Sequence, residues 1–384
     1  MLKLVVPMNK LKINLFLIFF LLFCQSSTQA IEDKLADDVI ILKESQDIEK
    51  KSDTTKFESL KLGIQKTFEE PKVIKFDNRY INEISSEMRF QGITSFEDSE
   101  NDFDTTFPMK ANLILNAKFL DNKYRFQSSF SFARNVDDLE HKFFGKFSSL
   151  YIERELNKNN AIRLGTSRVP LGVEGSISPY FYQFANGSQI SRNYSNITSQ
   201  GISLIGEYKQ FDYNLGAWSG TRNTQGLNDG IDFIGRIGFQ PFKEQEEHIL
   251  KNLKISASSD IGHSKGDYQV YGGALEYNYK KFFANAEYMY ANGSNRNSYN
   301  PQKGEGFFIT AGWDLTPKLQ ILGRYDFFDP DKHQKGDVSQ EYTIGFNYFM
   351  FKEKVRLGLN YVFCDYQNNK PHKNAIYLIT HFFI

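Results

Sequence analysis

The chain has 384 residues, and its 46 Lys and Arg are balanced by 46 Asp and Glu, so the formal net charge is zero and gives no support for nucleic-acid binding. The mean hydropathy is −0.47, and beyond one N-terminal stretch no segment approaches the ~20 apolar residues of a transmembrane helix, which excludes a helical membrane protein. The 36 Phe and 21 Tyr are many for so polar a chain. Aromatic girdles around a barrel with a polar interior produce this combination.

The N-terminus has the features of a secretory signal peptide. The apolar run Leu15–Phe23 follows Lys10 and Lys12 and precedes a small-residue site that ends at Ala30. The run is too short to cross ~30 Å of hydrocarbon as a helix. We therefore predict a signal peptide over residues 1–30, cleaved near Ala30, with Met8 as an alternative start.

Residues 31–76 form a charged stretch that is rich in Asp, Glu and Lys. Its apolar positions do not hold a heptad for the three or four repeats that a coiled coil needs. We predict an N-terminal extension on the periplasmic side, either helical or disordered. After removal of the signal, one cysteine remains, Cys364, so no internal disulfide can form.

From residue 77 to residue 384 the chain alternates between apolar and polar residues, as in Lys318–Phe328. A two-residue period places one set on each face of a strand. A soluble sandwich would bury the apolar face, whereas a transmembrane barrel turns it toward lipid and the polar face toward a lumen. The other features of the chain favour the barrel.

Sixteen strands are predicted, and between the first and the last they form seven pairs. We therefore expect an all-β fold, a 16-stranded antiparallel transmembrane β-barrel. Connections within pairs are tight, such as Asp121-Asn122 and Lys209-Gln210, with Gln240–Asn252 as the exception, while those between pairs are longer and hydrophilic. This alternation is the outer-membrane pattern. The predicted strands are Ile84–Thr94, Lys110–Leu120, Lys123–Ala133, Phe147–Leu156, Ala161–Val169, Gln200–Tyr208, Phe211–Ser219, Ile231–Phe239, Leu253–Gly262, Gln269–Tyr279, Phe282–Tyr290, Glu305–Asp314, Lys318–Phe328, Glu341–Met350, Glu353–Phe363 and Ala375–Ile384.

The longest connection, Pro170–Ser199, joins the fifth and sixth strands. Structureless loops of this size are usually functional. A sixteen-stranded barrel has an aqueous lumen, so we expect this loop to fold inward and narrow it. The alternative is a loop on the surface.

Several segments resemble the phosphate-selective porin O/P family: Gly165–Glu174 resembles the entry to its constriction loop, and Leu315–Leu319 with Arg324–Pro330 resembles its penultimate hairpins. The resemblance implies a homotrimeric, sixteen-stranded outer-membrane channel. In the family, phosphate choice depends on basic residues at the constriction. Here the long loop carries only Glu174 and Arg192 as charges, so phosphate or anion selectivity is not supported by the loop.

Alternation predicts which charged side chains face the lumen, where they would tune selectivity. Seven predicted inward-facing bases and seven inward-facing acids, Glu87, Glu207 and Asp232 among the acids, favour a weak overall charge preference. Arg324 and Asp326 are candidates for an ion pair within one strand face. The pore-lining candidates, the two loop residues included, are Arg89, Lys118, Arg125, Glu153, Arg163, Glu174, Arg192, Arg236, Glu276, Glu287, Arg324, Asp326 and Arg356.

The sequence predicts a passive diffusion channel for small hydrophilic solutes or ions in the bacterial outer membrane, in contact with its lipid. No H-E-x-x-H, G-x-S-x-G or C-x-x-C motif is present, so we expect no enzyme, metal or cofactor. The alternating last strand, Ala375–Ile384, favours insertion by the barrel assembly machinery. The alternative function is a closed barrel that acts as a surface, adhesion or structural protein.

Overall fold

Strands form nearly all of the regular structure in the computed structural model, which describes residues 72–99, 102–134, 143–219, 230–263, 266–295, 298–351, 354–367 and 371–384. These residues belong to one compact unit, residues 66–384. The predicted signal peptide and the extension up to residue 71 lie outside the described residues. No helix within the described ranges is long and apolar enough to span a bilayer.

The described residues contain eighteen strands in one sheet. In chain order they are β1 Lys72–Lys75, β2 Ile81–Ser99, β3 Asp102–Thr106, β4 Met109–Phe119, β5 Tyr124–Arg134, β6 Phe143–Asn157, β7 Asn160–Arg168, β8 Thr198–Tyr208, β9 Phe211–Ser219, β10 Ile231–Phe239, β11 Lys254–His263, β12 Asp267–Tyr279, β13 Phe282–Asn295, β14 Ser298–Thr316, β15 Leu319–Asp329, β16 Ser339–Met350, β17 Val355–Tyr366 and β18 Lys373–Phe383.

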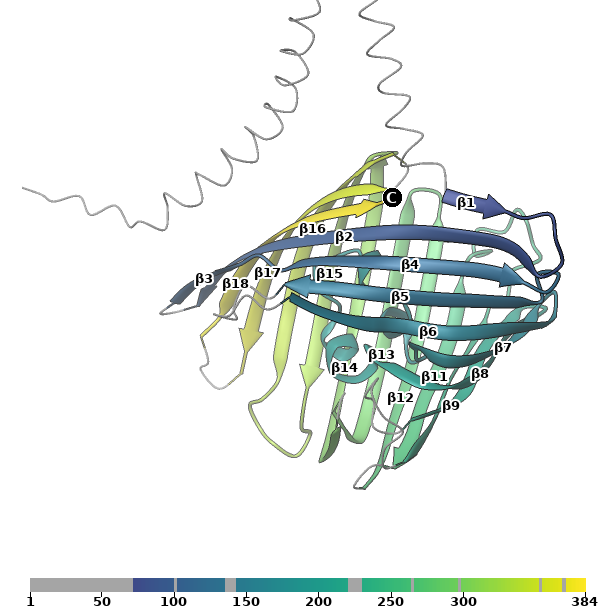
Figure 1. The fold of residues 1–384 in the computed structure, drawn as a ribbon. Helices are drawn as coiled ribbons and strands as arrows, with labels where there is room; N and C mark the ends of the chain where they lie inside the picture. Colours follow the sequence, from purple (N-terminus) through teal and green to yellow (C-terminus); the bar gives the residue numbers. More distant parts are fainter. Residues whose placement is uncertain are drawn as a thin grey trace, which may run out of the picture. The chain divides into compact units, whose positions relative to one another are not determined.

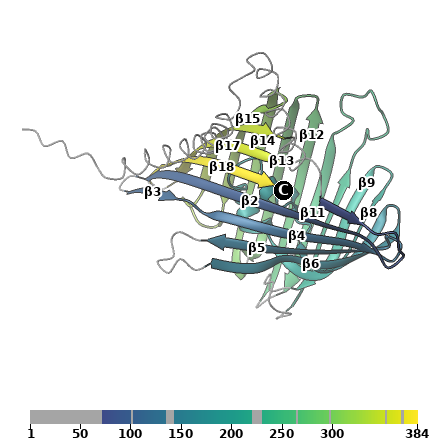
Figure 2. The same cartoon turned by 45° about the horizontal axis from the view of Figure 1, so that its top comes forward.

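The sheet closes on itself. Each strand from β4 to β17 pairs antiparallel with the next, β4 also pairs with β2, and β18 pairs with β2 from Asn374 opposite Asp98 to Phe383 opposite Arg89. β1 and β3 are short additions to β2, and the remaining strands form a closed antiparallel barrel of sixteen strands (Figures 1 and 2). The predicted fold class is thus confirmed, and each predicted strand overlaps one strand of the barrel.

The two additional strands were not predicted, because both depend on pairing partners rather than on their own sequence. β18 ends opposite Arg89, so the first half of β2 lacks a partner on that side. β1 occupies this edge, with Lys72 opposite Ser86 and Lys75 opposite Glu83. It lies within the stretch that the sequence assigned to the extension. β3 folds back on the other end of β2.

One predicted loop is largely strand. We expected Ala291–Gly304 to be a long hydrophilic connection, but β13 and β14 extend through most of it and pair as far as Asn295 opposite Ser298. A register shift between Asn292 and Ser294 lets the pairing continue. The composition of a hairpin tip thus resembles that of a loop although its backbone is paired.

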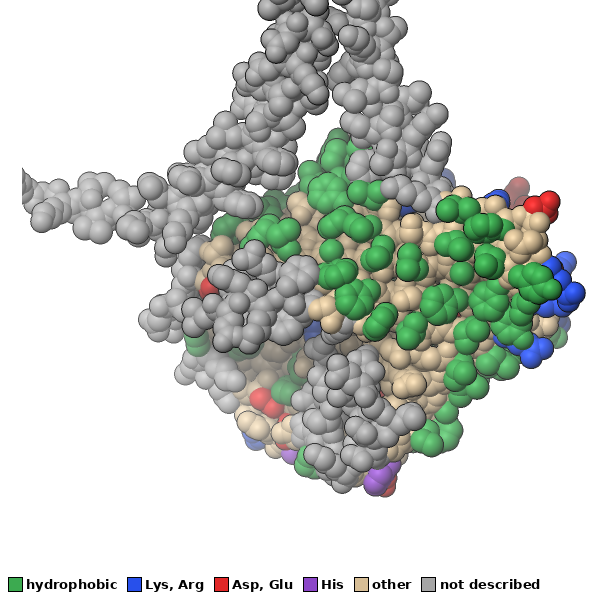
Figure 3. All heavy atoms as spheres, viewed as in Figure 1, with side chains coloured by type: hydrophobic (Ala, Val, Ile, Leu, Met, Phe, Trp, Pro, Cys, Tyr) green, Lys and Arg blue, Asp and Glu red, His purple; other side chains and the backbone are tan. Residues whose placement is uncertain are grey.

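The outward face of the barrel is apolar and the inward face is largely polar. On β14, Ile309 and Trp313 are 52% and 50% exposed, whereas Thr310 between them is 2% exposed. Hydrophobic side chains cover the outward face of the strands in Figure 3, and charged side chains gather at the rim, where tight turns join the strands. An apolar outer band is the surface that a barrel presents to lipid.

Candidate functional site

The connection between β7 and β8 lies inside the barrel. This segment, residues 169–197, is called the inner loop below, and it contains three short helical turns, α3 Val173–Ser176, η1 Pro179–Phe181 and η2 Ser191–Ser195. Leu171, Ser188 and Ile190 are fully buried. Inward-facing wall side chains hold the loop at its start, middle and end. The predicted inward fold of Pro170–Ser199 is thus observed, with its last two residues belonging to β8.

The start of the inner loop is anchored to β11 and β13. The Gly172 N–H donates to Ser258 Oγ at 3.2 Å, and the Val173 N–H donates to Glu287 Oε1 at 2.9 Å. Gly172 has φ +72°, and a Cβ there would lie 2.3 Å from Glu287 Oε1. Glycine is required at this position because it accepts the positive φ and leaves room for the carboxylate.

The middle of the inner loop is anchored to β17. The Arg356 guanidinium donates to the Tyr182 carbonyl at 2.6 Å, and the Ala185 N–H donates to Asn360 Oδ1 at 2.8 Å. Arg356 also contacts His381 Nδ1 of β18 at 2.8 Å. A loop inside a barrel must satisfy its backbone groups with side chains, and these strands supply them.

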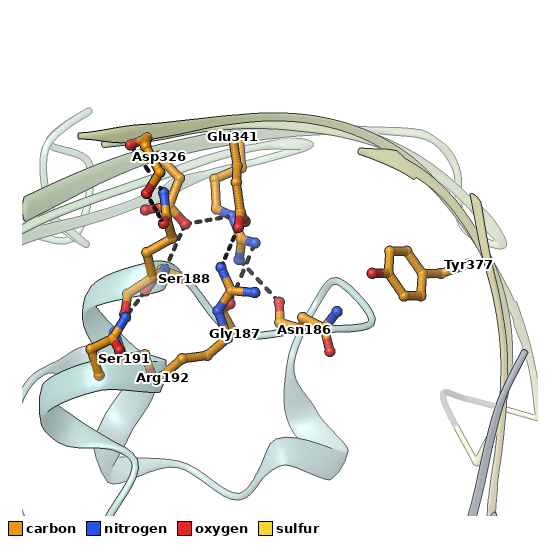
Figure 4. A network of polar contacts seen from close by, with 12 residues as sticks. Asn186, Gly187, Ser188, Ser191, Arg192, Asp326, Glu341 and Tyr377 are labelled. Carbon is orange, nitrogen blue, oxygen red and sulfur yellow. Dashed lines mark hydrogen bonds and ion pairs between the residues drawn. The ribbon is translucent and has the colours of Figure 1, made fainter. Parts of the chain in front are cut away.

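The end of the inner loop is anchored to β15 and β16 (Figure 4). The Gln189 N–H donates to Asp326 Oδ2 at 2.8 Å, and Arg192 forms an ion pair with Glu341 at 2.5 Å. In the close-up, Asp326 and Glu341 point from the wall toward the loop, whereas Tyr377 lies across an open space from it. A cavity of about 100 Å³ fills this space.

Arg324 connects the wall to both halves of the inner loop. Its guanidinium lies 3.6 Å from Glu174 Oε1 of the loop and 3.5 Å from Asp326 Oδ2 on its own strand. Glu174 in turn accepts the Ser188 N–H at 2.6 Å. The predicted pairing of Arg324 with Asp326 is confirmed, and it forms part of the loop anchorage.

Apolar packing supports the same side of the loop. Burying each large aliphatic side chain contributes about 1.5–3 kcal/mol, so this contact is a major part of the attachment. The buried cluster joins loop residues to inward-facing residues of β9 to β15 and consists of Val169, Leu171, Ile190, Tyr194, Ile197, Trp218, Ile234, Val270, Met289, Ala291, Phe308 and Phe328.

On the opposite side a cavity of about 600 Å³ separates the inner loop from the wall formed by β2 and β4–β7. The loop contributes Pro179, Tyr180 and Ile197 to its lining. Burial raises the pKa of Tyr180 to about 12, so its hydroxyl stays neutral. The described residues that line this cavity include no Asp or Glu, and their cations are Arg89, Lys110, Arg163 and Arg168.

Two of these cations pair with carboxylates that are not among the lining residues of the cavity. Arg89 donates to Glu87 at 2.7 and 3.0 Å, and Arg163 donates to Glu153 at 2.9 Å. Each guanidinium also lies over an aromatic ring, at 4.6 Å from the Phe181 centroid for Arg89. Such pairs hold the cations in place and offset part of their charge.

Arg168 has different partners. Its guanidinium donates to the Gly175 carbonyl at 3.1 Å and to Asn196 Oδ1 at 2.7 Å, both in the inner loop. These bonds place the Arg168 guanidinium at the junction of wall, loop and cavity.

The structure sorts the predicted pore-lining residues into groups, while their role in transport remains a prediction. Those that anchor the loop or belong to it are Glu174, Arg192, Arg236, Glu287, Arg324, Asp326 and Arg356. Those that line the larger cavity are Arg89 and Arg163. The remaining predicted residues face inward from the wall. Lys118 forms an ion pair with Glu83, Arg125 forms one with Glu153, and Glu276 lies opposite Lys254 in the register of β11 and β12.

Sequence reasoning missed several residues of this site. Lys110 is the second residue of β4, and alternation counted back from Lys118 would have placed it inward. Arg168 could not be found in this way. Alternation from the inward residues Arg163 and Ser167 places Arg168 on the outward face, but it is the last residue of β7, where the chain turns into the loop. The neutral anchor Asn360 was missed because only charged residues were considered.

Residues 256–381 match the family model described as phosphate-selective porin O and P, which confirms the family resemblance over this part of the chain. A search of curated proteins gave no match.

The fold is shared with many solved structures, of which three are described. A loop L8 deletion mutant of OmpT, an outer membrane protein of Vibrio cholerae, is 13% identical with a TM-score of 0.58 and 78% and 99% of the two chains covered. The anion-selective porin from Comamonas acidovorans is 12% identical with a TM-score of 0.57 and the same coverage. The outer membrane channel DcaP of Acinetobacter baumannii is 13% identical with a TM-score of 0.57, covering 81% and 99%.

Proposed function

We propose that this protein is an outer-membrane porin, a passive diffusion channel for small hydrophilic solutes. The observation that carries the proposal is the uneven attachment of the inner loop. Most of its anchors lie on β9–β17, and a cavity of about 600 Å³ remains between the loop and β2 and β4–β7. Solutes would cross the constriction through this cavity, called the passage below.

We further propose that the passage favours anions. Four cations line it, and no carboxylate is among its described lining residues. A channel wall of one charge sign concentrates ions of the opposite sign. The basic residues come from the wall rather than from the loop, which explains why the loop sequence gave no support for anion selectivity.

The alternative, a closed barrel that serves as a surface or structural protein, is less well supported. A blocked lumen would leave no reason for cations to line a cavity beside the loop. We retain as proposals the trimeric assembly, the insertion by the barrel assembly machinery, the cleavage near Ala30 and the periplasmic position of the tight turns. Family and fold point to a channel rather than an enzyme.

The proposal is tested by single-channel recording of the refolded protein in a planar bilayer. Defined open steps in KCl, with a reversal potential in a KCl gradient that has the sign of anion movement, are expected. Added phosphate tests the specificity for which the family is named. A folded barrel that gives no steps would refute the channel, and a reversal potential near zero would refute the anion preference.

A further inference from the structure

Neutral hydrogen-bonding side chains form a continuous track on the wall of the passage. Ser129 donates to Asn112 Oδ1 at 2.7 Å and lies 2.8 Å from Ser148 Oγ. Next to them, Tyr151 donates to Gln127 Oε1 at 3.0 Å, and Gln127 donates to Ser149 Oγ at 3.2 Å. The side chains are thus held in fixed positions by one another, and all of them line the passage.

Cations stand at both ends of this track. Arg89 is opposite Asn112 in the register of β2 and β4, and the Arg163 guanidinium lies 4.3 Å from the centroid of the Tyr151 ring. Lys110 and Arg168 line the same passage. A solute beside the track therefore meets positive charge together with a row of hydroxyl and amide groups.

These groups match one chemical class of solute. A serine hydroxyl offers one donor and two acceptors, and an Asn or Gln amide offers two donors and an acceptor oxygen. Hydroxyl groups on a solute can both donate to and accept from such a surface, whereas an unsubstituted alkyl chain displaces water from it without replacing the hydrogen bonds. The cavity volume of about 600 Å³ lies within the usual range for small-molecule sites.

We propose that the passage binds hydroxylated organic anions, such as six-carbon sugar acids, in preference to unsubstituted anions of the same charge. The carboxylate is attracted by the cations, and the hydroxyl groups exchange hydrogen bonds along the track. This inference rests on the proposed channel function and names the solute class of the same passage.

The test uses three probes with six carbons each: gluconate with charge and hydroxyl groups, hexanoate with charge alone, and sorbitol with hydroxyl groups alone. Each is added to both sides of a bilayer that holds the refolded protein in KCl, and the concentration that halves the single-channel current is measured. Gluconate is expected to act at a concentration at least about fivefold lower than either other probe, since one net hydrogen bond corresponds to about fivefold. Equal action by gluconate and hexanoate would overturn the inference.

A matched pair of variants locates the effect. Ser129→Ala removes the hydroxyl at the centre of the track and should raise the half-blocking concentration of gluconate about fivefold while leaving that of hexanoate unchanged. Ser256→Ala removes an equally buried, inward-facing hydroxyl on β11, which is not among the lining residues, and should change neither. An equal response of gluconate to both substitutions would refute the track. If the channel conducts KCl but gluconate and hexanoate block it at equal concentrations, only this inference is refuted. If no KCl steps are seen, the proposed channel function itself is refuted.

Discussion

The charge of the passage can be tested at Lys110. Lys110 lies opposite Gln91 on the inward face of β4 and lines the passage. Lys110→Gln removes one unit charge from a side chain of similar length. A unit charge about 4 Å from an ion contributes ~1 kcal/mol in water, which corresponds to about fivefold in local anion concentration. Screening leaves this contribution largely intact, because the Debye length at 0.1 M salt is ~10 Å.

We therefore expect Lys110→Gln to lower the anion-to-cation permeability ratio about fivefold, without inverting it, since three other cations remain in the passage. The assay is the reversal potential in a tenfold KCl gradient, for which a perfectly selective channel gives ~59 mV. Lys158→Gln, an equal charge change in the exposed turn between β6 and β7, is the control and should leave the potential unchanged. If both variants behave alike, the passage does not run past Lys110.

Three further outcomes follow from the loop anchorage. Deleting Gly175–Ile190 should raise single-channel conductance, and unchanged conductance would contradict an inner loop that narrows the lumen. Gly172→Ala places a Cβ 2.3 Å from Glu287 Oε1 at a φ of +72°, so the loop entry must shift, and larger conductance fluctuations than in the wild type are expected. Asp326→Ala removes the partner of a buried Arg324 and should cost about 3 kcal/mol of unfolding free energy in urea titrations. A cost below about 1 kcal/mol would mean that this anchor is dispensable.

The strands could be predicted because their signal is local. Alternation with period two, together with a tight turn, determines where a hairpin forms and which face of each strand points inward. The predicted strand Glu341–Met350 accordingly differs from β16 by only two residues at one end. β1 had no such signal. Four residues with the sequence KVIK form a strand because β18 leaves this part of the β2 edge unpaired, and where β18 ends cannot be read from the KVIK segment itself.

The inward fold of the loop could also be predicted, from its length and from the width of a sixteen-stranded barrel. The side of the wall that it contacts could not. That choice depends on pairs far apart in sequence, such as Val173 with Glu287, which are 114 residues apart, and Gln189 with Asp326, which are 137 apart. No single segment carries the information that these groups meet.

The same long-range contacts explain why counting wall charges and inspecting the cavity lining lead to different expectations. Seven inward bases against seven inward acids predict a weak charge preference for the whole wall, whereas the lining of the passage contains bases and no described acid. Glu287 and Asp326 accept hydrogen bonds from the loop backbone, so they are withdrawn from the passage together with the loop. On the wall that borders the passage, Arg89 and Arg163 are lining residues, whereas their partners Glu87 and Glu153 are not. Because most of the loop's anchors lie on β9–β17 and the cavity lies against the other wall, the charge of five strands, and not the total of sixteen, should set the selectivity.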